Sequence, residues 1–287
     1  MDSLNQIFRM PDFEALKALQ LYIKHHIEGV MIGMHQSPKT GFGIEFKEYR
    51  NYVPGDSLKQ LDWKYYARTD HYMIKEAEME KQHDFIFVLD RSLSMNFEMK
   101  DASKFNWART LIASLAFLAN NQQDKYYIFN QDNPPTDFET FLYRMIQLQT
   151  NGEMSIKDLS PSEKIKNKST VFIFTDGYSD ETEFKDLLKN WAVASEEVML
   201  IHLLFENEVK LEFDGQYFTF KDLEGQGSVQ INTQDGFQDY QNRVQEWRNG
   251  IEKACAKNGI AYWQLNGQEG IQKAIFEMLN HFNQSWA

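Results

Sequence analysis

The sequence predicts an α/β protein with a doubly wound, mostly parallel sheet and helices on both faces. Short apolar runs recur along the chain from residue 85 onward, and each is followed by a segment whose apolar residues recur every three or four positions. A strand buried on both faces is expected to be an unbroken apolar run, and its alternation with amphipathic helices is typical of parallel sheets. The composition, with 42% hydrophobic and 25% charged residues, is that of an ordinary globular protein.

The first expected element is a helix at about residues 12–27, which Pro11 and Asp12 introduce. Its apolar residues have helical spacing: Phe13, Leu16, Leu19, Ile23 and Ile27. Residues 29–72 show little periodicity but contain many aromatic residues and turn formers such as Gly41 and Pro54. We therefore expect an ordered, extended segment there, with a short hairpin.

Four strands and three helices are expected to alternate between residues 85 and 204. The clearest strand is Phe85–Leu89, which is apolar without interruption, and further strands are expected at 126–129, 171–174 and 198–204. The helices are expected at 104–120, 138–149 and 181–191. The first of these helices has Trp107, Leu111, Leu115 and Leu118 on one face, as a helix packed on a sheet requires.

A hairpin and three further elements are expected in the last third of the chain. Lys210–Phe213 and Gln216–Phe220 flank Asp214-Gly215, a pair typical of two-residue hairpin turns. A helix at 237–258, a strand at 260–263 and a helix at 271–282 follow. We predict two parts: residues 1–82 as a helix and extended segment packed on the main domain, and residues 83–287 as the main domain with a hairpin insertion near 209–221.

Charge and composition exclude several classes of function. The net charge of -12 is unfavourable for binding nucleic acid or an anionic membrane surface. A single cysteine, Cys255, allows neither an intrachain disulfide nor a cysteine-rich zinc site, and we expect it to be a half-buried thiol. The sequence has no signal-peptide pattern and no apolar stretch near the ~20 residues that cross a bilayer. We therefore predict a cytoplasmic protein without a membrane span.

Polar side chains follow two of the predicted strands. The first strand ends in Asp90-Arg91-Ser92-Leu93-Ser94 and the third in Thr175-Asp176-Gly177. If these strands are neighbours, Asp90, Ser92, Ser94 and Asp176 face one small space at the edge where open α/β sheets bind ligands. Carboxylate and hydroxyl oxygens suit Mg²⁺ or Mn²⁺. The alternative is local: the serines cap the next turn and Asp176 closes an Asx-turn.

Two motifs resemble known families. Asp90-x-Ser92-x-Ser94 after a buried strand resembles the metal-ion-dependent adhesion site of von Willebrand factor A domains, which have a Rossmann-like fold. Upstream, EFKEYRNYVPGD at residues 45–56, continued by Leu61–Lys64 and Ala67–Thr69, resembles the signature of the bacterial domain-of-unknown-function-58 family. Members of that family carry a von Willebrand A-like domain immediately after this signature. The specific resemblance covers about residues 29–120.

The resemblance implies a metal site formed by Asp90, Ser92, Ser94 and Asp176, with the choice among Mg²⁺, Mn²⁺ and Ca²⁺ left open. Von Willebrand A domains also use a threonine on a second loop, where this chain has Met154 and Ser155. The Ser155 hydroxyl is a possible substitute, whereas the apolar Met154 side chain is not. This departure leaves metal occupancy open.

The resemblance also implies a function. We expect a non-enzymatic interaction module in which a partner protein supplies a carboxylate to the metal, working with a MoxR-type AAA+ ATPase in protein assembly or remodelling. One alternative is a metal-free A-like domain that acts through its surface. Another is a metal-dependent phosphohydrolase with Asp90 as nucleophile, which lacks the second carboxylate because Ser92 occupies that position.

Two smaller predictions concern polar residues outside this site. Arg50, Asp56, Asp62 and Arg68 of the signature are expected to form an ion-pair network, with a partner contact as the alternative. His202 lies within an apolar strand, so we expect a hydrogen-bonded core residue there.

Overall fold

The computed structural model describes residues 4–10, 12–35, 46–52, 63–69, 71–77, 83–99, 102–130, 137–152, 154–161, 163, 165, 169–210, 217–221, 228–232, 237–265, 267 and 270–285. The chain divides into two compact units. The sheet unit comprises Met1–Gly33 and Gln82–Ala287, and the small unit comprises Met34–Lys81.

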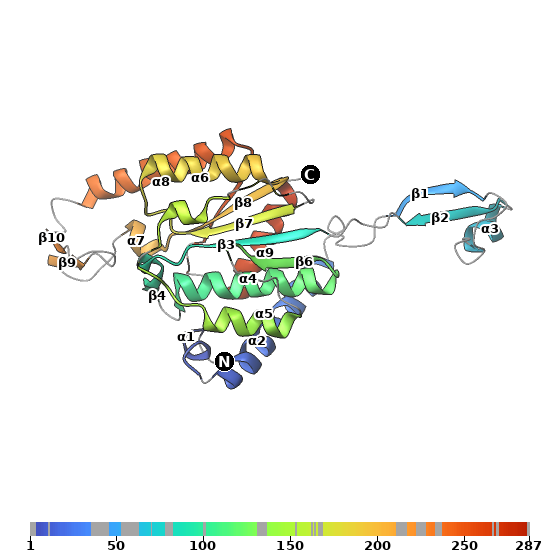
Figure 1. Cartoon of the computed structure of the whole chain (residues 1–287), viewed down its shortest axis with the longest axis horizontal. Coiled ribbons are helices and arrows are strands. Elements are labelled where there is room, and N and C mark those ends of the chain that lie inside the picture. The colour runs from blue at the N-terminus through green and yellow to red at the C-terminus, as the bar shows by residue number, and fades with distance from the viewer. Residues whose placement is uncertain are drawn as a thin grey trace. The chain divides into compact units, whose positions relative to one another are not determined.

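The sheet unit is built on five parallel strands in the order β11-β8-β7-β3-β6 (Figure 1). Their bounds are β3 Asp84–Leu89, β6 Lys125–Ile128, β7 Ser169–Thr175, β8 Glu197–Leu203 and β11 Ala261–Leu265. Every residue of β7 is buried, because neighbouring strands and helices on both faces cover it. The predicted α/β class, with a parallel sheet flanked by helices, is confirmed.

Helices cover both faces of this sheet, as Figure 1 shows. On one face lie α6 (Glu181–Ala194) and α8 (Phe237–Lys257), which pack Leu187, Trp191 and Cys255 against Val171 and Ile173. On the other lie α4 (Lys104–Asn121) and α9 (Ile271–Ser285), with α5 (Phe138–Gln147) against α4. Three of these helices begin at a capping residue whose side chain accepts a hydrogen bond from the first turn. The caps of α4, α5 and α6 are Ser103, Asp137 and Asp180.

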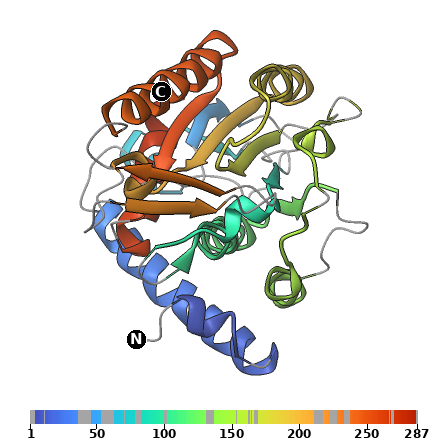
Figure 2. The same ribbon diagram turned by 90° about the vertical axis from the view of Figure 1, so that its left-hand side faces the viewer.

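The N-terminal helices also belong to the sheet unit. The elements are α1 (Leu4–Ile7) and α2 (Asp12–His35), and Figure 2 shows them along one side of the molecule, in blue. The guanidinium of Arg109 on α4 lies 3.7 Å from the ring centroid of Phe8, and α1 contacts α4 directly. The structure thus groups the first helix with the sheet, whereas the division predicted from the sequence placed it with the extended segment. The predicted division and the observed one both place a boundary near residue 82.

Short elements connect the strands to the helices. After β3 come the 3₁₀ helix η2 (Leu93–Asn96) and the antiparallel pair of β4 (Glu98–Met99) and β5 (Ala102–Ser103). The 3₁₀ helix η3 (Ile156–Leu159) precedes β7, and α7 (Glu206–Lys210) follows β8.

The predicted hairpin forms with a different partner. Strand β9 (Tyr217–Lys221) pairs antiparallel with β10 (Ser228–Asn232), and Lys210 belongs to α7 rather than to a strand. The Asp214-Gly215 turn lies outside the described residues. Residues 211–213 of the predicted first strand also lie outside the described residues. In β10, Val229 and Ile231 have the alternation that a strand favours.

The small unit contains an antiparallel pair and a helix. Strands β1 (Phe46–Asn51) and β2 (Met73–Ala77) pair, and α3 (Trp63–Thr69) lies between them in the sequence. The ring of Tyr66 stacks on that of Tyr72, with centroids 4.5 Å apart. Asp56 and Asp62 lie outside the described residues, so the predicted ion-pair network stays a prediction.

Candidate functional site

The candidate site lies where the strand order of the sheet reverses. Strand β3 has β6 on one side and β7 on the other, so the chain leaves β3 in one direction and later returns on its opposite side. In open α/β sheets, the crevice beyond the carboxyl ends of two such strands is the usual position of a binding site. Asp90 directly follows β3 and Asp176 directly follows β7. Strands β3 and β7 are neighbours, which meets the condition on which the predicted site depended.

The Asp90 carboxylate organises the turn after β3. Its Oδ1 accepts a hydrogen bond from the Ser92 backbone N–H at 2.9 Å, and its Oδ2 accepts one from the Thr175 hydroxyl at 2.6 Å. The Asp90 backbone N–H also donates to the Phe174 carbonyl, which extends the β3–β7 pairing by one residue. Burial, and next the neighbouring Asp176 charge, raise the pKa of Asp90.

Ser92 and Ser94 form the partly exposed rim of the site. Their hydroxyl oxygens lie 3.0 Å apart, within hydrogen-bond distance. Ser92 occupies the N-cap position of η2, but its side chain makes no capping hydrogen bond. The local alternative, in which this hydroxyl caps the following turn, therefore fails for Ser92.

Asp176 forms a buried ion pair that the sequence analysis did not anticipate. Its Oδ2 accepts a hydrogen bond from the Lys104 ammonium at 3.0 Å, and both side chains are almost completely buried, with exposures of 0% and 1%. Its Oδ1 accepts from the Tyr178 backbone N–H at 3.3 Å, which is the Asx-turn geometry of the local alternative. Asp176 is thus part of the interior rather than of the rim.

A second carboxylate, that of Glu208 on α7, completes the pairing of Lys104. Its Oε1 lies 2.5 Å from the Lys104 Nζ, and its Oε2 accepts a hydrogen bond from the Phe205 backbone N–H. The rings of Tyr178 and Phe97 lie 4.9 and 5.4 Å from the same ammonium. Burial raises the pKa of Glu208, and the Lys104 charge opposes that rise. The ammonium is thus enclosed by two anions and two aromatic rings.

Lys104 is the first residue of α4, where a positive charge is unfavourable. The helix dipole places partial positive charge at this end, and acidic side chains are favoured there. Ser103 caps the helix, and the Lys104 backbone N–H donates to the Phe97 carbonyl. A lysine at the first position of a helix, where the dipole disfavours it, was the signal in the sequence that pointed to this cation. Neither Thr175 nor Glu208 had a comparable signal.

The second loop comes next to the first motif but does not bring Ser155 into it. The Arg91 side chain donates to the Gln149 carbonyl at 2.7 Å, and the Asn151 backbone N–H donates to the Arg91 carbonyl. The Ser155 hydroxyl instead accepts a hydrogen bond from the Lys157 backbone N–H and forms a capping box with Asp158 at the start of η3. Met154, the other residue at the place where the threonine was expected, packs against the core between the sheet and α6.

The residues do not fit a divalent ion held jointly by Asp90, Ser92, Ser94 and Asp176. The Oδ2 of Asp176 already binds a buried ammonium, and a divalent ion beside it would be repelled at short range in a poorly solvated place. The second-loop hydroxyl is committed to a helix cap. Among the described residues, no group of three or more His, Cys, Asp or Glu side chains could hold a metal.

Behind Asp176, an imidazole and an indole close the site. The Nε2 of His202 lies 3.0 Å from the Asp176 carbonyl oxygen, and its Nδ1 lies 2.9 Å from the Tyr262 hydroxyl. Burial lowers the pKa of His202 to about 4. His202 is fully buried, as the prediction of a hydrogen-bonded core residue requires. The Trp247 ring of α8 stacks on Tyr178 with an interplanar angle of 2°.

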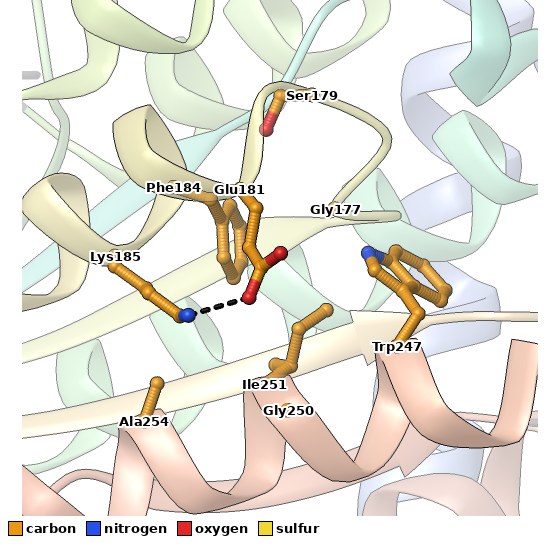
Figure 3. Close-up of a pocket in the computed structure, with 9 residues that line it drawn as sticks. All are labelled: Gly177, Ser179, Glu181, Phe184, Lys185, Trp247, Gly250, Ile251 and Ala254. Carbon is orange, nitrogen blue, oxygen red and sulfur yellow. Dashed lines mark hydrogen bonds and ion pairs between the residues drawn. The ribbon is translucent and has the colours of Figure 1, made fainter. Parts of the chain in front are cut away.

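A small pocket lies between α6 and α8, on the far side of the loop after β7. Figure 3 shows Trp247, Ile251 and Ala254 of α8 on one wall, with Phe184 of α6 opposite. The two charged side chains at its mouth, Glu181 and Lys185, pair with each other at 2.5 Å. Gly177 is required at its rim: its φ is +71°, and a Cβ atom there would lie 3.3 Å from both Ile251 and Trp247. We assign no chemistry to this mostly apolar pocket.

Comparison with known proteins identifies a family. The family model described as "Protein of unknown function DUF58" matches residues 48–250. Uncharacterized proteins of Mycobacterium bovis and Mycobacterium tuberculosis are each 33% identical to this chain over 104 residues, which is 36% of this chain and 33% of the relative. The match thus spans about a third of the length of these relatives.

Two solved structures resemble the chain at a distance. An aerotolerance-related membrane protein from Bacteroides fragilis aligns with a TM-score of 0.40 and 17% identity, covering 69% of this chain and 98% of that one. The conserved hypothetical protein BatB from Bacteroides thetaiotaomicron aligns with a TM-score of 0.41 and 19% identity, covering 70% and 98%. We draw no conclusion about this chain from them. Among the described residues, no helix is both long and apolar enough to cross a bilayer.

Proposed function

This chain belongs to the DUF58 family, and we propose that it is a non-enzymatic protein-interaction module whose docking surface is the edge beyond β3 and β7. The main support for this proposal is that the base of this edge is buried and ion-paired, whereas its rim is partly exposed. At the base, Asp176, Lys104 and Glu208 are buried and ion-paired with one another. At the rim, Ser92 and Ser94 are partly exposed and Tyr178 is 42% exposed. Fixed loops that present hydroxyl and aromatic groups suit binding, because they lose little entropy on docking.

The state of the buried His202 and Cys255 side chains supports a role in binding. A nucleophile needs an activating base within hydrogen-bond reach and access to substrate. His202 is fully buried, both its ring nitrogens have partners, and its pKa is lowered to about 4. Cys255 is buried, and burial raises the pKa of its thiol to about 12. Neither group is accessible to a substrate, and the Cys255 thiol is not in the thiolate form that a nucleophile needs.

The finer fold type in this proposal is that of von Willebrand factor A domains. In support, the strand order places the first strand between the second and third, and Asp90-x-Ser92-x-Ser94 follows that first strand. The proposed partner is a MoxR-type AAA+ ATPase, which the family resemblance suggests. An acidic side chain of the partner would accept hydrogen bonds from the Ser92 and Ser94 hydroxyls.

A second candidate is the metal-dependent version, in which Mg²⁺ or Mn²⁺ bridges the partner's carboxylate to the same residues. The observation in its favour is the pair of serine oxygens 3.0 Å apart beside the buried Asp90 carboxylate. It would require Asp176 to exchange its ammonium partner for the ion. The ion pair of Lys104 therefore makes the metal-free version our first choice.

Binding to a purified MoxR-type AAA+ ATPase from the same genome tests the proposal. Ser94→Arg places a long, charged side chain in the rim and should weaken binding at least tenfold, as measured by biolayer interferometry. Asn121→Arg makes the same charge change at the exposed end of α4, next to the amino end of β6, and should leave binding unchanged. Equal affinities for the two variants would contradict the proposed docking surface.

A further inference from the structure

We propose that Lys104 takes the place of a divalent metal ion in this adhesion-type site, so that a covalently tethered cation holds the site together. The inference concerns the base of the site and does not depend on which partner binds the rim. It follows from where the ammonium lies, what encloses it and which parts of the chain it joins.

The ammonium lies against Asp176, one of the residues predicted to hold a metal. Its nitrogen lies 3.0 Å from Asp176 Oδ2, on the carboxylate that the motif would offer to a metal. Asp176 Oδ1 already accepts the Tyr178 backbone N–H. Both oxygens of Asp176 are therefore in use within the protein. A divalent ion at this carboxylate would lie beside the ammonium and be repelled by it.

Two carboxylates and two aromatic rings surround the ammonium and fix its position. Glu208 is its second anionic ligand, and the Phe205 backbone N–H holds the other oxygen of that carboxylate. The rings of Phe97 and Tyr178 lie within about 6 Å, the range in which an aromatic ring attracts a cation. The Lys104 side chain is 1% exposed, so water does not compete for these contacts.

The ammonium joins the turn after β7, which a metal at this site would also hold, to α4 and α7. Lys104 begins α4, Asp176 follows β7 and Glu208 lies on α7, so one charge cross-links three segments distant in sequence. A structural metal supplies such a cross-link only when it is bound. A lysine supplies it at every metal concentration. The chain therefore keeps the geometry of the site without a metal supply.

Thermal unfolding with EDTA and with Mg²⁺ or Mn²⁺ tests this inference on wild type, Lys104→Ser and Lys104→Met. Wild type should show the same Tm in all conditions. Lys104→Ser leaves two carboxylates around an open space, so its Tm should be lower in EDTA and rise by a few degrees when Mn²⁺ is about ten times its Kd. Lys104→Met fills the same space with an apolar chain and should be destabilised without recovery in Mn²⁺.

Lys157→Ser is the matched control, because it removes an exposed lysine that also pairs with a carboxylate, that of Glu183. It should show no response to metal. If Lys104→Ser does not fold in EDTA, the readout becomes recovery of its far-UV circular dichroism on adding Mn²⁺. A stoichiometric, metal-dependent rise in the Tm of wild type would overturn the proposal, and so would a Lys104→Ser variant that binds no metal. Neither result depends on binding to the ATPase.

Discussion

Thr175 links the turns that follow β3 and β7 through one hydroxyl group. The hydroxyl donates to Asp90 Oδ2 at 2.6 Å and accepts a hydrogen bond from the Gly177 backbone N–H at 2.9 Å. The residue is fully buried, so water cannot replace either bond. This hydroxyl therefore fixes the turn after β7 relative to the turn after β3.

Replacing Thr175 with Val should lower the free energy of unfolding by about 1–3 kcal/mol, since the isosteric side chain leaves a buried carboxylate oxygen and an N–H group unpaired. Urea denaturation should show a lower midpoint with an unchanged slope. Thr182→Val, at an exposed position on α6, makes the same chemical change and should be nearly neutral. Equal midpoints for the two variants would mean that the Thr175 hydroxyl contributes nothing measurable.

At the level of residues, the sequence predicted one half of the site. Asp90 and Asp176 could be placed together because parallel strands align their carboxyl ends, and this reasoning needs only the strand assignment. Lys104 and Glu208 could not be paired in advance, because one starts a helix and the other lies on a short helix after β8. Only the folded chain brings them together. The role of Ser155 as a cap depends on Asp158, three residues later, a local signal that the metal hypothesis overlooked.

At the level of elements, continuous apolar runs were enough to locate the five sheet strands. Strands such as β7 are buried on both faces, so periodicity plays no part and hydrophobicity alone marks them. The partner of β9 could not be predicted in the same way. A two-stranded ribbon has little burial to mark its strands, so the sequence did not show that β10 pairs with β9. Three glycines of the described residues have positive φ, and two of them, Gly259 and Gly267, permit a matched test.

Gly259 and Gly267 have the same backbone conformation, with φ of +68° and +69°, but different surroundings. A Cβ atom at Gly259 would have no neighbour within 4 Å, whereas one at Gly267 would lie 2.5 Å from the Phe205 ring. Gly259→Ala should therefore cost about 1–2 kcal/mol for the left-handed backbone alone. Gly267→Ala should cost more, because the buried ring has to move. A Gly267→Ala variant with the higher unfolding midpoint would contradict this ordering.

At the level of the whole molecule, the core between the sheet and α6 and α8 encloses the single cysteine of the chain. Burial, and next the Glu252 charge, raise the pKa of Cys255 from 9.0 to about 12. The native state thus keeps this proton at a pH where the unfolded chain has lost it. Stability is therefore unaffected below pH 9 and falls as the pH rises from 9 toward 12.

The free energy of unfolding should decline by about 1.4 kcal/mol for each pH unit above 9 on account of this group alone. Cys255→Ala should be less stable at pH 7 because it leaves a small cavity, but its stability should fall less steeply between pH 8.5 and 10. Some slope should remain, because burial also raises the pKa of Tyr262. Urea titrations across this range measure both slopes, and parallel curves would show that Cys255 does not titrate as expected.

The division of the sheet unit into residues 1–33 and 82–287 has a consequence for how the protein is made. The ribosome completes α1 and α2 before any residue of the sheet exists. The apolar stripe of α2 includes Leu16, Leu19 and Ile23, which are buried in the finished molecule, and Phe8 meets its partner Arg109 only about a hundred residues later. At roughly 5–20 residues per second, this stripe is exposed for several seconds during translation. The helices α1 and α2 thus precede the elements that cover them, and the nascent chain exposes an apolar stripe that the native protein buries.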